Sequence, residues 1–251
     1  MSIFLGRIYF VFVYRLSWFF FAIGGTFFSV FVWAPMLILP KRERLGVLVR
    51  RQLQFLFKAW VEWMHFTGVA RIEFDGFDKN FAPGTIFIAN HPSLLDATFL
   101  LARLPDTICI FKPLLMKNPV TGPAAVMAGF VSAASGVDLI REATKKLKSG
   151  PSLLVFPEGT RTSPGESLGK LKAGFAMIAD RAQSPVQLIL IRTSPDLARR
   201  GRFWWVAPKE LPAAFNCSID RLWLPEATRS VKEFTDEVEA YMQARLDGKP
   251  A

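Results

Sequence analysis

The segment 90–96 reads Asn-His-Pro-Ser-Leu-Leu-Asp and places a histidine and an aspartate five positions apart. If Asp96 accepts a hydrogen bond from one ring nitrogen of His91, it fixes the tautomer and leaves the other nitrogen to take a proton. Such a base activates an alcohol hydroxyl, which is a poor nucleophile until it is deprotonated. The alternative is that Ser93 and Asp96 form only a helix N-cap resembling a capping box, beside an ordinary loop histidine.

A second polar motif, Phe-Pro-Glu-Gly-Thr-Arg, occupies residues 156–161. Gly159 permits a tight turn, and its backbone amide can approach an anion. The guanidinium of Arg161 offers a fork of donors suited to a phosphate or carboxylate. Glu158 can bind acceptor hydroxyls or orient Arg161. The alternative is an ordinary turn at a strand end with a surface ion pair.

Each motif directly follows a short apolar run, and from about residue 70 such runs alternate with helical stretches. This alternation predicts an α/β fold with a mainly parallel central sheet flanked by helices. The ends of parallel strands are where such proteins bind ligands. The predicted strands are Arg71–Phe74, Thr85–Ala89, Thr107–Phe111, Ser152–Phe156, Val186–Ile191 and Phe203–Val206. The predicted helices are Leu94–Ala102, Pro123–Ala128, Val137–Lys148, Gly174–Arg181 and Val231–Leu246.

The N-terminal segment is apolar and lacks charged residues from Leu16 to Leu39. It is long enough to cross a bilayer as a helix. Gly24, Gly25 and Pro35 weaken a single straight helix, so a helical hairpin lying in one leaflet is an equal alternative.

Basic residues follow this segment in the sequence Lys-Arg-Glu-Arg at 41–44 and outnumber those before it, which places the rest of the chain on the cytoplasmic face of the cell membrane. Residues 45–66 then read as an amphipathic helix, with Trp60 and Trp63 suited to headgroup depth. We therefore divide the chain into a membrane-associated helical segment, 1–66, and an α/β domain, 67–251.

The composition is 51% hydrophobic with a formal net charge of +10. A basic balance suits an anionic membrane surface or acidic substrates and carriers. The absence of zinc-finger and helix-turn-helix signatures argues against nucleic acid. Cys109 and Cys217 fit neither a metal site nor a disulfide framework, and only two histidines are present, so we expect no metal.

Together the two motifs resemble those of the glycerolipid acyltransferase superfamily, whose bacterial members include the lysophosphatidate (1-acylglycerol-3-phosphate) acyltransferases. The resemblance covers about residues 45–191 and includes Lys-Ala-Gly at 172–174. It implies a seven-stranded α/β sheet with an N-terminal two-helix membrane element. It also implies acyl-CoA or acyl-acyl carrier protein as donor substrate, a lysolipid-like acceptor and no cofactor.

The resemblance further implies residue roles. His91 is the general base and Asp96 its orienting partner. Glu158, Gly159, Thr160 and Arg161 belong to the acceptor site. Asn90, Ser93, Lys112 and Ser135 have supporting positions.

Two features depart from the family pattern. Ser135 stands where relatives carry an arginine that contacts the acceptor phosphate, and Gln187 interrupts a Val-Pro-Val-like strand. These changes keep open a non-phosphate acceptor, such as an aryl polyene or a lyso-aminolipid. A thioesterase using water as acceptor and a non-catalytic lipid-binding scaffold also remain open. The basic residues of the predicted helix 137–148 are either a solvated face or a docking surface for an acidic carrier.

Overall fold

A seven-stranded sheet forms the centre of the chain, in the strand order β1-β7-β6-β2-β5-β3-β4. The structure, a computed structural model, describes residues 2–39, 42–119, 121–133, 136–194, 203, 206–207, 211–226 and 228–248. The strands are β1 Ala70–Asp75, β2 Ile86–Ala89, β3 Thr107–Phe111, β4 Val131–Ser132, β5 Ser152–Val155, β6 Val186–Ser194 and β7 Ala213–Trp223.

The strand directions place the ends of several strands at one edge. β6, β2, β5, β3 and β4 run parallel, whereas β7 runs antiparallel to β6 and parallel to β1. The sheet is therefore mixed but mainly parallel. The carboxyl ends of β2, β5 and β3 meet at a single edge, so the loops that follow them lie close together.

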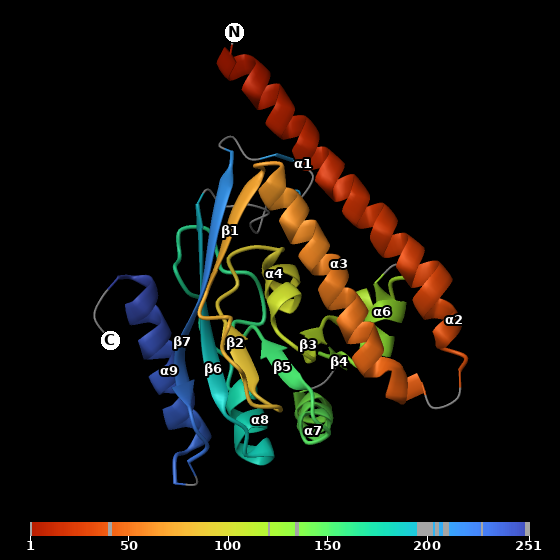
Figure 1. Cartoon of the computed structure of the whole chain (residues 1–251). Helices are drawn as coiled ribbons and strands as arrows, with labels where there is room; N and C mark the ends of the chain where they lie inside the picture. Colours follow the sequence, from red (N-terminus) through yellow and green to blue (C-terminus); the bar gives the residue numbers. More distant parts are fainter. Residues whose placement is uncertain are drawn as a thin grey trace.

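Helices cover both faces of the sheet (Figure 1). α3, α4 and α6 lie on one face, and α7, α8 and α9 lie on the other. The described helices are α1 Ser2–Phe27, a π-helix Phe28–Trp33, α2 Ala34–Met36, a 3-10 turn Arg42–Leu45, α3 Gly46–Phe66, α4 Asp96–Arg103, α5 Pro113–Met116, α6 Gly122–Ala128, α7 Gly136–Leu147, α8 Gly174–Ala182 and α9 Val231–Leu246.

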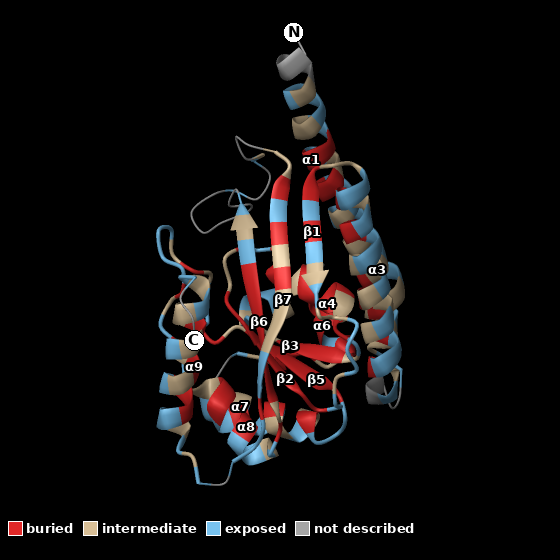
Figure 2. Cartoon of the chain, turned by 60° about the vertical axis from the view of Figure 1, so that its left-hand side comes forward, coloured by how far each residue is buried: buried red, intermediate tan, exposed pale blue. Residues whose placement is uncertain are grey.

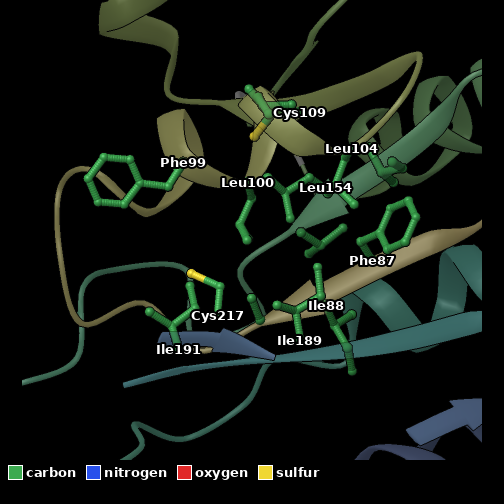
Figure 3. Packing of buried hydrophobic residues seen from close by; sticks show 14 of the residues in the cluster. Phe87, Ile88, Phe99, Leu100, Leu104, Cys109, Leu154, Ile189, Ile191 and Cys217 are labelled. Atoms are coloured by element: carbon green, nitrogen blue, oxygen red, sulfur yellow. The ribbon is translucent and has the colours of Figure 1, made fainter. Parts of the chain in front are cut away.

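The core lies between the central strands and the helices. Every residue of β2 and β5 is buried, whereas β1 alternates between buried and exposed positions (Figure 2). In the close view of the core, Phe99 and Leu100 of α4 lie over the sheet near Cys217 of β7 (Figure 3). Burial on both faces explains why the central strands read as continuous apolar runs in the sequence.

The N-terminal helix is continuous from Ser2 to Met36 but changes its winding before Pro35. Proline lacks an N–H, and its ring clashes with the carbonyl four residues earlier in a regular α-helix. Here residues 28–33 form a wider π-helix, in which the N–H of Ala34 donates to the carbonyl of Ser29. Gly24 and Gly25 do not interrupt the helix, so of the two alternatives the structure contains the single helix and not a hairpin.

The N-terminal helix lies against α3, which runs in the opposite direction (Figure 1). Indole N–H groups join the two helices: Trp60 donates to the Ser17 carbonyl at 3.0 Å, and Trp33 donates to the Gln52 side chain at 3.0 Å. The predicted boundary at residue 66 coincides with the end of α3, but the division into two domains stays a prediction. Several α3 side chains are buried in the shared core.

Five of the six predicted strands form, β3 with the predicted bounds and the other four with shifted ends. In the sixth, Phe203 and Val206 belong to no strand, and Trp204 and Trp205 lie outside the described residues. Strands β4 and β7 and helix α5 were not predicted. β7 is the largest omission, although the alternation of Phe215 and Cys217 with polar neighbours was a detectable signal.

Candidate active site

The loop after β2 is anchored by Asn90. Its side-chain amide donates to the carbonyl of Ile191 on β6 and accepts from the Ile191 N–H, both at 2.8 Å. Asn90 is buried, so these bonds extend the β2–β6 pairing by one residue through a side chain. The predicted supporting position of Asn90 is thus a backbone anchor immediately before His91.

His91 and Asp96 are in contact. The Nδ1 atom of His91 lies 2.9 Å from Oδ2 of Asp96, and the same oxygen accepts the Ser93 N–H at 2.8 Å. Because an ionised carboxylate only accepts hydrogen bonds, Nδ1 carries the proton in this arrangement. Nε2 is then the basic nitrogen, and it makes no hydrogen bond within the described part of the chain.

Asp96 is fully buried at the start of α4. Burial raises the pKa of this carboxyl above its usual value, and the hydrogen bond and charge of His91 oppose that rise. Within the described residues its Oδ1 atom has no hydrogen-bond partner. Ser93 contributes its N–H to Asp96 and accepts the Leu95 N–H on its hydroxyl at 3.2 Å. The predicted His–Asp contact therefore forms, whereas the predicted Ser93 cap does not. The N-cap residue of α4 is Leu95, and no side chain caps the helix, so only the Asp96-to-Ser93 half of the expected capping box is present.

Two features of the second motif hold His91 in place. The ring of Phe156 stacks on the His91 ring, with centroids 4.1 Å apart and planes inclined by 20°. The carbonyl of His91 accepts the N–H of Thr162 at 2.8 Å. The sequence did not indicate either contact, although the apolar residue opening the motif was visible.

Glu158 is buried, and its carboxylate points into the protein. Oε1 accepts the His91 N–H at 2.8 Å and the Thr162 hydroxyl at 3.0 Å, and Oε2 accepts the Gly169 N–H at 2.9 Å. The acceptor-binding role expected for Glu158 stays a prediction. The observed contacts are all with the protein, and none orients Arg161.

Gly159 adopts a left-handed conformation, with φ of +69°. Its N–H donates to the Phe156 carbonyl at 2.9 Å, so the amide expected to approach an anion closes the turn instead. An added Cβ at Gly159 would lie 2.7 Å from Nζ of Lys172, so the lysine lies directly over the turn. Thr160 is exposed and Arg161 is half-buried.

Among the residues that the structure describes, the remaining predicted positions make no hydrogen bond or ion pair with His91 or Asp96. Lys112 is exposed immediately after β3, at the same edge of the sheet as His91. Ser135 lies outside the described residues. Gln187 lies near the start of β6, away from this edge, where its side chain bonds the carbonyls of Asp220 and Arg221 beside a bulge in the β6–β7 ladder. Gln187 therefore lies beside a structural irregularity at the opposite end of β6 from His91.

The basic helix α7 begins near the edge of the sheet where His91 lies. Its two lysines, Lys145 and Lys146, lie in its last turn. Arg141 pairs with Asp138 at 2.8 Å, and Lys146 lies 3.8 Å from Glu142. The Leu147 carbonyl lies close to Gly84, in the loop that precedes β2. The lysine-rich end of α7 thus lies at the amino ends of the parallel strands, opposite His91.

A cavity of about 470 Å³ lies between the N-terminal helix, α3, α4 and α6. Its lining includes Ala97 and Thr98, in the helical turn that contains Asp96. Its walls are almost entirely apolar and include Gly24 and Gly25 of α1. The volume is within the range of roughly 300–1,000 Å³ that is usual for ligand sites. The remaining lining residues include Phe20, Phe21, Trp33, Leu53, Phe57, Trp60, Trp63, Leu101, Phe111 and Phe130.

The described ranges of the chain contain no evident metal-binding site. No group of three His, Cys, Asp or Glu side chains there lies close enough together to hold an ion. Cys109 and Cys217 are both buried thiols.

Comparison with known proteins places these features in context. Residues 71–192 match the family model described as Acyltransferase. A 1-acyl-sn-glycerol-3-phosphate acyltransferase from Helicobacter pylori is 32% identical over 134 residues, which is 51% of this chain and 55% of that protein. One from Cocos nucifera is 29% identical over 137 residues, or 52% of this chain and 44% of the relative. The chain thus spans about half the length of the curated relatives it matches.

The fold is also similar to that of a solved structure. The crystal structure of the 1-acyl-sn-glycerophosphate (LPA) acyltransferase, PlsC, from Thermotoga maritima aligns with a TM-score of 0.76 over 96% of each chain, at 24% sequence identity. The matched segment 71–192 contains both polar motifs and the ends of β2, β3 and β5. Residues 71–192 therefore form an acyltransferase-family domain, which is similar to that of the 1-acyl-sn-glycerol-3-phosphate acyltransferases.

Proposed function

We propose that this protein transfers a fatty acyl group from acyl-CoA or acyl-acyl carrier protein to a hydroxyl of a lysophospholipid-like acceptor. The observation that carries the proposal is the His91–Asp96 contact of 2.9 Å together with a large apolar cavity whose lining includes Ala97 and Thr98, the two residues that follow Asp96. A base alone suits many reactions. A base next to a long apolar cavity suits one whose substrate carries an alkyl chain.

The reaction follows from the tautomer that Asp96 favours. Nε2 of His91 takes the proton of the acceptor hydroxyl as that oxygen attacks the thioester carbonyl carbon. The tetrahedral intermediate collapses, the carbon–sulfur bond breaks, and the protonated ring returns its proton to the departing thiolate. Asp96 stabilises the imidazolium formed between these steps. The products are an ester and a free thiol, so His91 ends in its starting state.

The cavity is the proposed site of the acyl chain. Burying one methylene group contributes about 0.8 kcal/mol, so a long chain gains much of its binding energy from such walls. The walls come from both the N-terminal helix and α4, so the N-terminal segment is part of the substrate site in this proposal.

A phosphate-bearing acceptor is favoured by the cationic side chains around the second motif. Arg161 is half-buried there, and Lys172 lies over Gly159. A guanidinium binds phosphate through paired hydrogen bonds. The names of the curated relatives, 1-acyl-sn-glycerol-3-phosphate acyltransferases, point to the same acceptor class.

We further propose that the N-terminal helix lies in the cytoplasmic leaflet of the membrane and does not span the bilayer. The segment Gly6–Met36 is long and apolar enough to cross a bilayer, a criterion that buried core helices and signal sequences also meet. Hydrogen bonds join this segment to α3 near both of its ends. The Tyr9 hydroxyl donates to the carbonyl of Thr67, the residue after α3, and the Trp33 indole donates to Gln52 of α3. Because α3 packs on the α/β sheet, a spanning orientation would carry the polar domain surface into hydrocarbon.

The outward face of the same helix fits an in-plane orientation. Exposed apolar side chains recur about every four residues along it, interrupted by Arg15, whose long side chain can reach headgroup depth. These exposed residues are Ile8, Phe12, Phe19, Ile23, Phe27 and Phe31.

The acceptor class is tested with purified membranes that carry the protein. Labelled acyl-CoA and acyl-acyl carrier protein are supplied with lysophosphatidate, a lyso-aminolipid or no acceptor. Formation of labelled phosphatidate supports the proposal. Transfer only to the lyso-aminolipid would replace the acceptor and keep the mechanism. Release of free fatty acid alone would indicate a thioesterase, and no reaction in any arm would contradict the enzymatic proposal.

A further inference from the structure

We infer that Glu158 is a positioning residue for His91 and does not bind the acceptor. The side chain is 4% exposed, and both of its oxygens are engaged by the protein. Oε1 already accepts two hydrogen bonds, and Oε2 is buried against Gly169, so a substrate hydroxyl has little access to either oxygen. This inference rests on the proposed function only in assigning His91 the role of base.

The contacts of Glu158 reach the backbone of His91 and not its ring. Oε1 accepts the His91 N–H at 2.8 Å, and Thr162 returns a hydrogen bond from its own N–H to the His91 carbonyl at 2.8 Å. The peptide groups on both sides of the His91 Cα are thus held by one short segment, 158–162. With the His91 backbone held in this way, the contact with Asp96 fixes the remaining freedom, which is the rotation of the His91 side chain.

The second oxygen of Glu158 connects this segment to a loop from farther along the chain. Oε2 accepts the Gly169 N–H at 2.9 Å, and a Cβ added to Gly169 would lie 2.7 Å from that oxygen. The loop is secured in turn by α9, because Glu239 accepts the Leu171 N–H at 2.8 Å. Glu158 therefore joins the His91 loop to the C-terminal helix through buried hydrogen bonds.

The position of Gly169 provides a variant that disturbs Glu158 without replacing it. Gly169→Ala forces the carboxylate to move, because the added methyl group would overlap Oε2. It leaves the carboxylate charge in place. Gly169→Ala and Glu158→Ala should therefore share one phenotype if Glu158 positions His91.

The first readout does not depend on catalysis. Amide hydrogen exchange is measured in the peptide that contains His91, for the full-length protein in detergent, with Arg161→Ala as the matched control from the same motif. We expect exchange at His91 to be at least tenfold faster in Glu158→Ala and Gly169→Ala, and unchanged in Arg161→Ala. Unchanged protection of His91 in both folded variants would overturn the inference, even if no acyl transfer is found. If Glu158→Ala does not fold, the exchange rate at His91 in Gly169→Ala alone decides between the two outcomes.

The second readout separates positioning from binding. With the acceptor that the wild-type protein uses, we expect Glu158→Ala to lower kcat at least tenfold while the acceptor KM changes less than twofold. Glu158→Gln keeps a carbonyl oxygen that can accept the His91 N–H, so it should recover part of the lost kcat. An acceptor KM raised tenfold at unchanged kcat in Glu158→Gln would assign Glu158 to acceptor binding instead.

Discussion

Asn90 and Ile191 are joined by two hydrogen bonds of 2.8 Å between one side-chain amide and one backbone residue. Asn90→Ala leaves the N–H and carbonyl of Ile191 without these partners, and each unpaired buried group costs about 1–3 kcal/mol. We expect the free energy of unfolding to fall by about 2 kcal/mol or more. Chemical denaturation measures the change. Asn80→Ala, at an exposed position, is the control, and equal stability of the two variants would contradict the anchoring role.

Asp96→Asn tests the tautomer assigned to His91. The asparagine amide is neutral, so it stabilises the imidazolium less than a carboxylate does. If its nitrogen turned toward Nδ1, that nitrogen would also face the Ser93 N–H, so the variant loses either the charge alone or the charge and the shared acceptor together. We expect kcat to fall about 10⁴-fold while the fold is retained, as in other His–Asp pairs. Steady-state kinetics measure the loss. A variant that keeps a tenth or more of the wild-type kcat would show that the carboxylate does not control the reacting nitrogen.

The same substitution has a pH-dependent effect on stability. Burial raises the pKa of Asp96 in the folded protein. Between the unfolded pKa of about 3.9 and the raised folded pKa, the folded state binds the extra proton, so this carboxyl's contribution to stability falls as pH rises. We expect the stability of Asp96→Asn relative to wild type to increase from pH 4 upward and then level off. Denaturation at several pH values measures this difference, and a constant difference would contradict the raised pKa.

Gly24→Leu should shorten the acyl chain that the protein prefers. Gly24 lines the cavity, and a Cβ at this position meets no atom within 4 Å, so the larger side chain can enter the open space without distorting the helix. Each methylene excluded from the cavity forfeits about 0.8 kcal/mol, or about a fourfold preference. Competition between acyl donors of different length measures the shift.

Gly6→Leu is the matched control for this change. Gly6 lies in the same helix and also has no atom within 4 Å of an added Cβ, but it does not line the cavity. An equal shift in chain preference for both variants, or none for Gly24→Leu, would exclude this cavity as the acyl-chain site.

The two cysteines should be unreactive in the folded protein. Burial raises the pKa of the Cys109 thiol to about 12 and raises that of Cys217 further. The thiolate is the reactive form, so iodoacetamide at pH 8 should label neither residue before denaturation and both after it. Mass spectrometry measures the labelling. Rapid labelling of either cysteine with loss of activity would contradict the buried positions.

The sequence predicted the central strands and the contact between His91 and Asp96 because both depend on local patterns. Continuous apolar runs identified β2 and β5, and the spacing of His91 and Asp96 is set within a single loop and helix start. The role of Glu158 depends on partners 67 and 11 positions away, which no local pattern specifies. Glu158 was therefore assigned to the acceptor site, and its buried contacts with the protein were not predicted.

The surroundings of Gln187 were unpredictable for a related reason. Its partners are carbonyls of β7, a strand that was not predicted, so the sequence did not reveal the bulge beside it. The continuous path of the N-terminal helix through Gly24 and Gly25 was one of two alternatives that the sequence left open. Its contacts with α3, which the sequence of one segment does not specify, outweigh the low helix propensity of glycine.

The most direct test of the central claim compares His91→Ala with His65→Ala, which alters the other histidine of the chain at an exposed position on α3. Acyl transfer is measured in membranes with equal amounts of each folded protein. The account predicts that His91→Ala loses at least 10³-fold in kcat, since a positioned general base contributes about 10²–10⁴-fold, and that His65→Ala retains wild-type activity. Activity in folded His91→Ala within tenfold of wild type would contradict the assignment of His91 as the base.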